Sequence, residues 1–350
     1  MEEGPLSTPP INSTPFGKEI KTDCLSRIRG SFQERGLPQE TINILCKGWR
    51  DSTHKQYTSY VKRWSSFCTE HNAQETQSSV EFILKFFTHL FHKGYSYSAI
   101  NTTKSALLTF VKVDNKYSWN TDPLIVRFFK GVFNLKPPTP KYSFSWDVDI
   151  VLNYLSKAYP LSDISLKDLT LKAITLIALT SGSRAQSLHL MSTDCMDKNN
   201  LRFQFFFKQP LKTSKAGTPH HLIEIRKFDN NPKLCVYATL LEYLNRTENL
   251  RKSTAIWISF NKPHKPICSQ TISRWLKLTL KDSGINIDKF TGHSIRMAAT
   301  SKANNLGVGL HTILKTAGWS TDNNFKKFYL REIMDDDRQK FAEAILEARM

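Results

Sequence analysis

The stretch "TGHSIRMAATSKANNLGVGLHTILKTAGWSTDNNFKKFYLRE", residues 291–332, places a histidine, an arginine, a tryptophan and a tyrosine in order along a basic, helix-like run. His293 and Arg296 are three residues apart, so on a helix they are neighbours on one face. Gly307 is typical of a helix end. A His-x-x-Arg pair is weak by itself, because a surface pair or a half-buried histidine gives the same pattern. The residues around the pair therefore decide its meaning.

Another arginine, Arg184, stands upstream in a turn between two helices. The sequence LTLKAITLIALTSGSRAQSLHLM, residues 169–191, reads as an apolar helix that stops at Ser181-Gly182, followed by a second helix. Ser183 and Gln186 have the spacing of a capping box. This spacing predicts Arg184 in the first turn of the second helix.

Two strand-like segments follow this arginine. LRFQFFF at 201–207 and HHLIEIR at 220–226 alternate in the manner of strands, and Asn199-Asn200 reads as a hairpin-type turn. The connection PLKTSKAGTP at 210–219 carries Lys212 and Lys215. We expect a small antiparallel sheet with lysines at its tip, inside a domain that is otherwise helical.

The first third of the chain is also helical. Residues 38–134 read as four or five short helices; Ser52 can cap one, Gly94 ends another, and Asp122-Pro123 suits a helix start. The preceding residues are rich in proline and poor in apolar side chains, and LKPPTPKYS at 135–143 favours an extended connector. We predict a mobile leader at 1–36, a helical domain at 37–135, a linker at 136–143 and a second domain at 144–350.

The charge of the chain points to a polyanionic partner. It has 49 Lys plus Arg against 31 Asp plus Glu, a net charge of +18, spread along the chain in a way that suits a groove following a polyanion's backbone better than a basic tail. On charge alone, DNA, RNA and anionic lipid all remain possible partners. Solvated surface lysines would give the same pattern at any single position. The candidate DNA-contacting residues are Lys55, Lys62, Arg63, Lys104 and Lys215.

Other features limit the class of protein. No apolar run approaches the roughly 18 residues of a membrane span, and the start of the chain lacks a secretory signal, so an intracellular location is expected. The six cysteines form no Cys-x-x-Cys pair, which indicates reduced thiols rather than a zinc site or a disulfide framework.

The order of these parts resembles the tyrosine recombinase, or phage-integrase, family. The pattern of that family is an arginine, a hairpin lysine, His-x-x-Arg, a histidine or tryptophan, and a nucleophilic tyrosine. The matching residues here are Arg184, Lys212, His293, Arg296, Trp319 and Tyr329. The resemblance implies a mainly α fold with a small antiparallel β-sheet, in which a helical core-binding domain precedes an α+β catalytic domain. WRDSTHKQYTSYVKRW and the GWS…FY ending look closest to eukaryotic mobile-element recombinases of the Crypton and DIRS/Ngaro types.

The resemblance also implies roles for these residues in cutting and rejoining DNA through a 3′-phosphotyrosyl link. Planar guanidinium groups at Arg184 and Arg296 suit the two nonbridging phosphate oxygens of the transition state. Tyr329 is the expected nucleophile and His293 its base. Lys212, or Lys215 as a fallback, would protonate the leaving 5′ oxygen. Trp319 would contribute contact and packing, and the scheme requires no metal and no other cofactor.

The expected partner is double-stranded DNA, bound by a homotetramer on paired sites, in the nucleus if the host is eukaryotic, with no membrane and no small-molecule substrate. Three departures weaken the case for activity: Ser187 replaces the usual acidic residue, Trp319 replaces a histidine, and Tyr329 lies one residue further on than is commonest. Two alternatives remain open: a catalytically weak or inactive domesticated DNA-binding protein, and a monomeric type IB topoisomerase.

Overall fold

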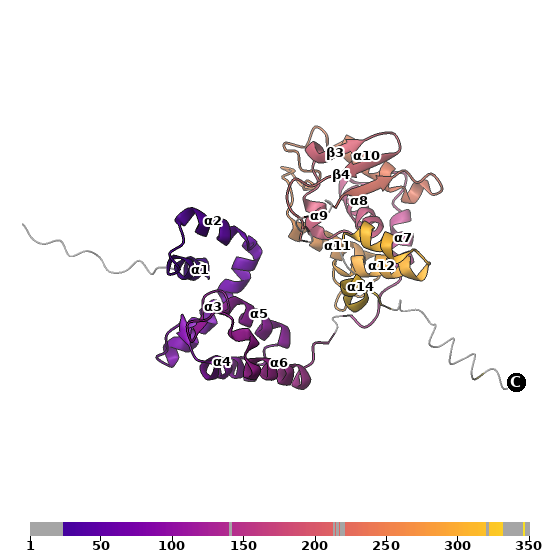
Figure 1. Ribbon diagram of the computed structural model, residues 1–350. Helices are drawn as coiled ribbons and strands as arrows, with labels where there is room; N and C mark the ends of the chain where they lie inside the picture. The colour runs from indigo at the N-terminus through magenta and orange to yellow at the C-terminus, as the bar shows by residue number, and fades with distance from the viewer. Residues whose placement is uncertain are drawn as a thin grey trace, which may run out of the picture. The chain divides into compact units, whose positions relative to one another are not determined.

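The computed structural model describes residues 24–139, 142–212, 214, 217, 221–319, 322–331 and 346 of the 350-residue chain. The chain forms two compact units, Met1–Thr139 and Pro140–Met350, and each has a hydrophobic core of its own (Figure 1). The division falls within the expected linker at 136–143. That the first unit binds DNA and the second is catalytic stays a prediction.

The described part of the first unit is a helical bundle. Its helices are α1 (Cys24–Gln33), α2 (Gln39–Lys47), α3 (Asp51–Glu70), α4 (Val80–His92), α5 (Tyr97–Leu107) and α6 (Pro123–Leu135). Val61, Trp64 and Phe67 recur at helical spacing on α3 and are buried, which explains why this helix packs along one face. Asp122 caps α6 by accepting a hydrogen bond from Leu124 N–H, as its position before Pro123 predicts.

Two expectations for this unit were wrong in detail. The leader at 1–36 is too long, because residues 24–33 form α1 and bury Cys24 and Ile28; residues 1–23 lie outside the described residues. Ser52 does not cap α3, which begins at Asp51 after Arg50. Helix α5 ends at Leu107, and β2 (Lys112–Val113) then pairs in parallel with β1 (Gln77–Ser78).

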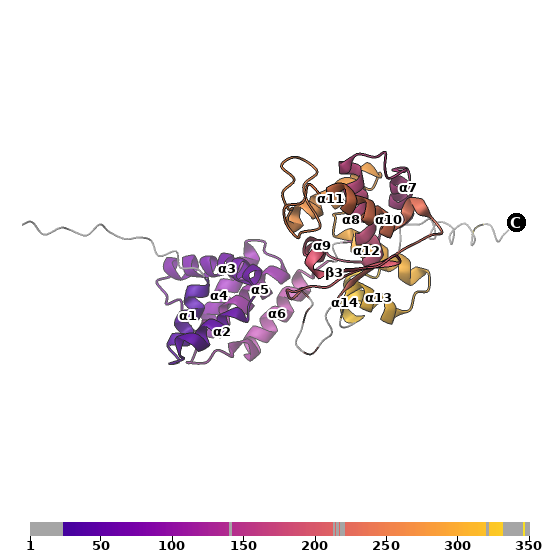
Figure 2. The same cartoon turned by 90° about the horizontal axis from the view of Figure 1, so that it is seen from above.

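The second unit is built around one buried helix, α8 (Leu166–Ser181). Twelve of its sixteen residues are buried, so the helix is covered by neighbours on nearly every side. Figure 2 shows this helix among the others of the unit, which are α7 (Val148–Ser156), α9 (Ala185–His189), α10 (Val236–Thr247), α11 (Ser269–Asp282), α12 (Ser294–Asn305), α13 (Leu310–Ala317) and α14 (Asp322–Phe328).

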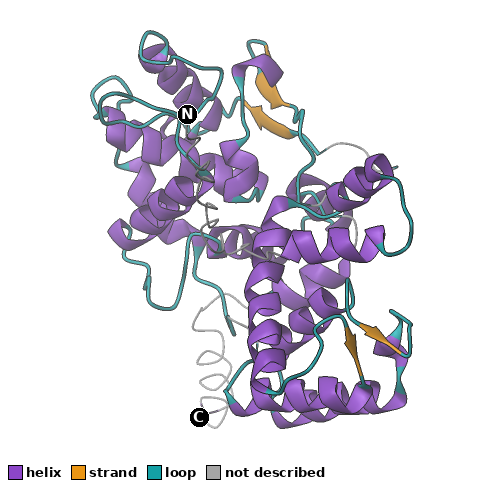
Figure 3. Cartoon of the chain, turned by 90° about the vertical axis from the view of Figure 1, so that its left-hand side faces the viewer, coloured by secondary structure: helices purple, strands orange, loops and turns teal. Residues whose placement is uncertain are grey.

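The strands are few beside the helices (Figure 3). The expected sheet is confirmed: β4 (Arg202–Phe205) pairs antiparallel with β5 (Ile223–Arg226), and β3 (Met196–Lys198) adds a strand that the alternation did not reveal. Phe203, Phe205, Ile223 and Ile225 point into the core of the second unit. Asn199 closes the β3–β4 turn by accepting from the N–H groups of Leu201 and Arg202.

Two further observations bear on the expected class. None of the helices described here is both long and apolar enough to span a bilayer. All six cysteines are free thiols, as the absence of Cys-x-x-Cys pairs predicts.

Candidate active site

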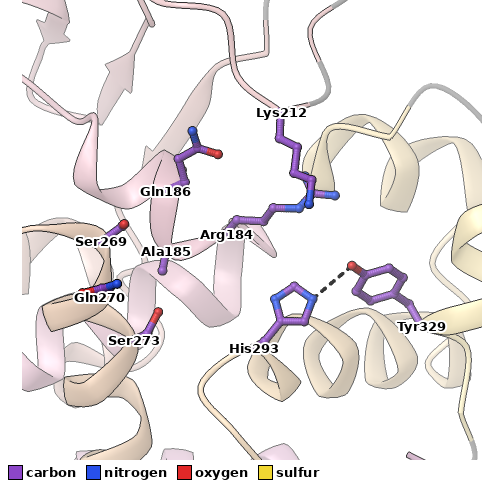
Figure 4. Close-up of a pocket in the computed structure, with 9 residues that line it drawn as sticks. All are labelled: Arg184, Ala185, Gln186, Lys212, Ser269, Gln270, Ser273, His293 and Tyr329. Carbon is purple, nitrogen blue, oxygen red and sulfur yellow. Dashed lines mark hydrogen bonds between the residues drawn. The ribbon is translucent and has the colours of Figure 1, made fainter. Parts of the chain in front are cut away.

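Four of the predicted catalytic side chains point into one cavity of about 460 Å³ in the second unit (Figure 4). They are Arg184, Lys212, His293 and Tyr329. They come from the start of α9, the connection between β4 and β5, the start of α12 and the residue that follows α14. Four separate segments therefore converge on one place.

The turn that carries Arg184 is shaped by Gly182. This glycine ends α8 at a φ of 56°, a left-handed conformation that side chains with a Cβ rarely adopt. A Cβ here would lie 3.3 Å from Ala317 Cβ, so the end of α8 also packs closely against α13. The expected capping box is wrong: Arg184 is the residue before α9, and the Ser183 hydroxyl is buried without a partner among the described residues.

His293 and Tyr329 contact one another across the cavity. His293 Nε2 lies 3.1 Å from the Tyr329 hydroxyl, and the two rings meet edge to face. His293 is the residue that precedes α12 and its side chain is exposed, so its imidazole faces the open side of the cavity. This distance allows a proton to pass between the phenol and the imidazole.

Arg296 and Trp319 do not line the cavity, but both lie close to the Tyr329 ring. The Arg296 side chain is 2% exposed, and Nη1 donates to the Gly182 carbonyl in the Arg184 turn. Its guanidinium lies 3.8 Å from the Trp319 ring centroid and 5.4 Å from that of Tyr329. Arg296 Nε and Nη2 are buried and have no hydrogen-bond partner within the described ranges, which is uncommon for buried polar groups.

The electrostatics of this cluster favour an anion. Burial, and then the positive charge of Arg184, lower the pKa of Arg296 to about 9, while Tyr329 acts in the opposite direction. Burial and the charges of Arg296 and Arg184 lower the pKa of His221 to about 4, so this imidazole is neutral near pH 7. Two guanidinium groups that repel one another would both be stabilised by a phosphate between them.

Trp319 packs against Tyr329 and the buried Arg296 together. It packs with Phe325 and Tyr329, at centroid distances of 5.5 and 4.6 Å, and is itself buried. Gly318 has a φ of 69° and lets the chain turn just before Trp319. A Cβ on Gly318 would lie 2.9 Å from His221 Nδ1. The Trp319 turn therefore rests on His221, a residue that sequence reasoning missed.

The rest of the cavity wall is polar and was also missed. Gln186 from α9 and Ser269, Gln270 and Ser273 from α11 line the cavity with Ala185. In Figure 4 they lie on the side opposite Tyr329. Gln186 was noted only for its capping-box spacing, and no motif marks the serines and Gln270 of α11, which the approach of α11 to the Arg184 turn makes neighbours of α9. Ser187, where an acidic residue was expected, is buried.

Two lysines of the hairpin connection were candidates for the general acid. Lys212 is exposed and lines the cavity, whereas Lys215 lies outside the described residues. Within the part of the chain that the structure describes, no three His, Cys, Asp or Glu side chains gather in a way that could hold a metal ion.

The DNA-contacting candidates of the first unit fall into two kinds. Lys55 and Lys62 are exposed on α3. The Arg63 guanidinium lies about 5 Å from the Tyr60 and Tyr95 ring centroids, and Lys104 Nζ lies 4.1 Å from that of Phe129. Burial also lowers the pKa of Lys104. Arg63 and Lys104 thus have packing roles of their own, while Lys55 and Lys62 remain available for phosphates.

The chain matches the model of the phage integrase family over residues 153–334, just over half of its length. This range contains all six predicted catalytic residues. The chain matches no curated protein by sequence.

Several solved structures share its fold. The XerH site-specific recombinase in a post-cleavage complex with palindromic difH substrate gives a TM-score of 0.60 at 11% identity, with 94% of this chain and 98% of that chain covered. The Tn1549 transposon integrase in complex with transposon right-end DNA gives a TM-score of 0.54 at 13% identity, with 93% of this chain and 100% of that chain covered. A lambda integrase tetramer bound to a Holliday junction gives a TM-score of 0.50 at 16% identity, with 89% of this chain and 78% of that chain covered. At these identities the likeness concerns the fold alone.

Proposed function

Because this chain belongs to the phage integrase family, the tyrosine recombinases, we propose that it cuts and rejoins DNA strands through a 3′-phosphotyrosyl intermediate at Tyr329. One observation carries this proposal. The Tyr329 hydroxyl lies 3.1 Å from His293 Nε2 beside a cavity that Arg184 and Lys212 also line. A nucleophile, a base and two cations are the groups that phosphoryl transfer to a tyrosine requires.

The proposed reaction forms one bond and breaks another. The Tyr329 oxygen attacks phosphorus while its proton passes to His293, and the bond from phosphorus to the 5′ oxygen breaks. Lys212 supplies a proton to that leaving oxygen. Arg184 and Arg296 bind the two nonbridging oxygens, and the unpartnered Nε and Nη2 of Arg296 support this role. Resealing reverses these steps with a new 5′ hydroxyl, so no ATP is needed.

We propose that the first unit grips the same duplex through α3. Lys55 and Lys62 are exposed there and can neutralise phosphates, which adds affinity without sequence preference. Assembly into a tetramer on two DNA sites is part of the proposal, and the tetramer named in the lambda integrase structure supports it. A mobile-element origin of Crypton or DIRS/Ngaro type, and a nuclear location in a eukaryotic host, stay predictions.

The test is to trap the covalent intermediate. A nicked suicide substrate taken from the DNA that flanks the gene loses the fragment needed for resealing, so the 3′-phosphotyrosyl adduct accumulates and survives SDS gels. We expect an adduct with the natural chain and none with Tyr329→Phe, which keeps the ring and removes the hydroxyl. Tight DNA binding without any adduct would instead favour the alternative of a domesticated protein that binds without cutting.

A further inference from the structure

One buried hydroxyl holds the backbone on both sides of the proposed nucleophile. Ser301 of α12 is fully buried, and its Oγ donates to the Tyr329 carbonyl at 2.8 Å. The same Oγ accepts from the Arg331 N–H at 3.1 Å. The helix that presents His293 to the Tyr329 hydroxyl therefore also holds the Tyr329 main chain, about two turns further along.

The hydrogen bonds of Ser301 leave its own helix. Serine and threonine inside a helix commonly donate back to the carbonyl four residues before them. The neighbouring Thr300 does so, with its hydroxyl 2.8 Å from the Arg296 carbonyl oxygen. The Ser301 hydroxyl therefore serves the segment at Tyr329–Arg331, which packs against α12, and not the hydrogen bonding of α12 itself.

Arg331 extends this contact to the start of the second unit. Its Nε donates to the Tyr142 carbonyl at 2.8 Å. The Tyr142 hydroxyl is 2.8 Å from Thr291 Oγ1, and its ring stacks on Phe290. Tyr142 was expected in the linker but belongs to the fold of this unit. The contacts form a closed circuit, because Thr291 lies two residues before His293.

We infer that Ser301, Arg331 and Tyr142 form a clamp that positions Tyr329 for attack, with its hydroxyl at His293 and its ring against Arg296. This inference rests on the proposed function, since position matters to catalysis only if Tyr329 is the nucleophile. The three are positioning residues, because none of them lines the cavity. A clamp matters here because α14, which leads into Tyr329, is only seven residues long, and a displacement of about 1 Å can slow a reaction a hundredfold.

The first measurement needs no DNA. In Ser301→Ala the Arg331 amide loses its acceptor, so hydrogen exchange over residues 325–331 should accelerate about tenfold or more. Thr300→Val is the matched control: it removes a buried hydroxyl of the same helix whose bonds stay within that helix. We expect exchange over 325–331 to be unchanged in this control. Unchanged exchange in Ser301→Ala would overturn the inference.

The second measurement is the single-turnover rate of adduct formation on the suicide substrate. Ser301→Ala should slow it between about tenfold and a hundredfold without weakening DNA binding, while Thr300→Val should be close to the natural chain. Arg331→Lys, which keeps the charge but loses the bond from Nε, tests the clamp through a milder change and should slow the reaction in the same direction.

A sulfur-substituted substrate separates positioning from acid catalysis. When sulfur replaces the leaving 5′ oxygen, the leaving group needs no proton, because a thiol has a pKa of about 8.5. This substrate should relieve the defect of Lys212→Ala but leave that of Ser301→Ala in place. Relief of Ser301→Ala, or a natural rate in that variant, would overturn the clamp. If the natural chain forms no adduct, the proposed function fails, and the exchange measurement still decides the clamp.

Discussion

Trp319 supports two residues of the proposed site, because it contacts both Arg296 and Tyr329. We expect Trp319→Ala to slow adduct formation about a hundredfold, since both neighbours lose the surface that holds them. Trp319→Phe should cost less than about tenfold, because an aromatic face remains for the cation. Single-turnover cleavage with DNA affinity as a control measures this. Equal losses in both variants would show that the indole N–H, and not packing, is what matters.

His221 makes the stability of the second unit depend on pH. Its folded pKa of about 4 lies below the ordinary histidine value of about 6.5, so the folded state resists protonation while the unfolded state accepts it. The contribution of neutral His221 to the free energy of unfolding is fully present above about pH 6.5 and is lost as the pH falls from there toward 4. Between pH 7.5 and 5 we expect the natural chain to lose about 2 kcal/mol more than His221→Gln.

Urea unfolding at the two pH values measures this difference. His221→Gln is the useful comparison because the two proteins differ at this residue alone. A pH dependence that is the same in the two proteins would show that His221 is not held neutral between its two cationic neighbours.

At the level of helices, the loop that carries His293 packs closely against α11 because Gly292 has no side chain. A Cβ on Gly292 would lie 2.7 Å from the Ser273 carbonyl oxygen and 3.1 Å from Leu276 Cβ. We expect Gly292→Ala to destabilise the protein by about 1–3 kcal/mol and to displace His293, which would slow cleavage. Gly309→Ala is the control, because a Cβ there meets nothing within 4 Å. Thermal unfolding of the two variants should separate them clearly.

Helix α8 contains a lysine in its buried length. Lys172 is 1% exposed, its Nζ donates to the Ala158 carbonyl at 2.6 Å, and burial lowers its pKa to about 8. Because the folded pKa lies below the ordinary lysine value of about 10.5, the fold loses stability as the pH falls from 10.5 toward 8 and the buried lysine gains its charge. Lys172→Met should therefore raise the unfolding free energy at pH 7 by about 2 kcal/mol.

The gain from Lys172→Met should shrink as the pH rises from 8 toward 10, where the lysine of the natural chain loses its charge. Chemical unfolding across this range gives the comparison. A gain that is constant with pH would mean that packing of the methionine side chain, and not removal of a buried charge, is responsible.

For the full chain, the net charge of +18 predicts that DNA affinity falls steeply with salt. If six to ten phosphates are contacted, affinity should drop roughly 10³- to 10⁵-fold between 50 and 200 mM salt. Lys55→Glu with Lys62→Glu should reduce the slope of log affinity against log salt by about two. Lys157→Glu with Lys281→Glu changes the net charge equally at exposed positions that the proposal does not use. Equal slopes for the two double variants would count against α3 as a DNA-binding helix.

The sequence by itself determined the helical class, the hairpin near Lys212 and the order of the six candidate site residues. Each of these follows from a local sequence pattern. The patterns are the helical spacing of apolar residues on α3, the alternation in β4 and β5, and the order of the motif residues along the chain. The patterns failed where the signal was weak, as at α1, whose few apolar residues follow a proline-rich leader, and at Ser183, whose capping role did not materialise.

Only the tertiary structure decided how the site is held. The burial of Arg296 against Trp319, the support of Gly318 by His221, and the bonds from Ser301 to Tyr329 and from Arg331 to Tyr142 join residues far apart in the chain. No local periodicity encodes such pairs, because they depend on how α8, α12 and α13 pack. Side-chain packing selects one arrangement among the many that the same pattern of apolar residues permits.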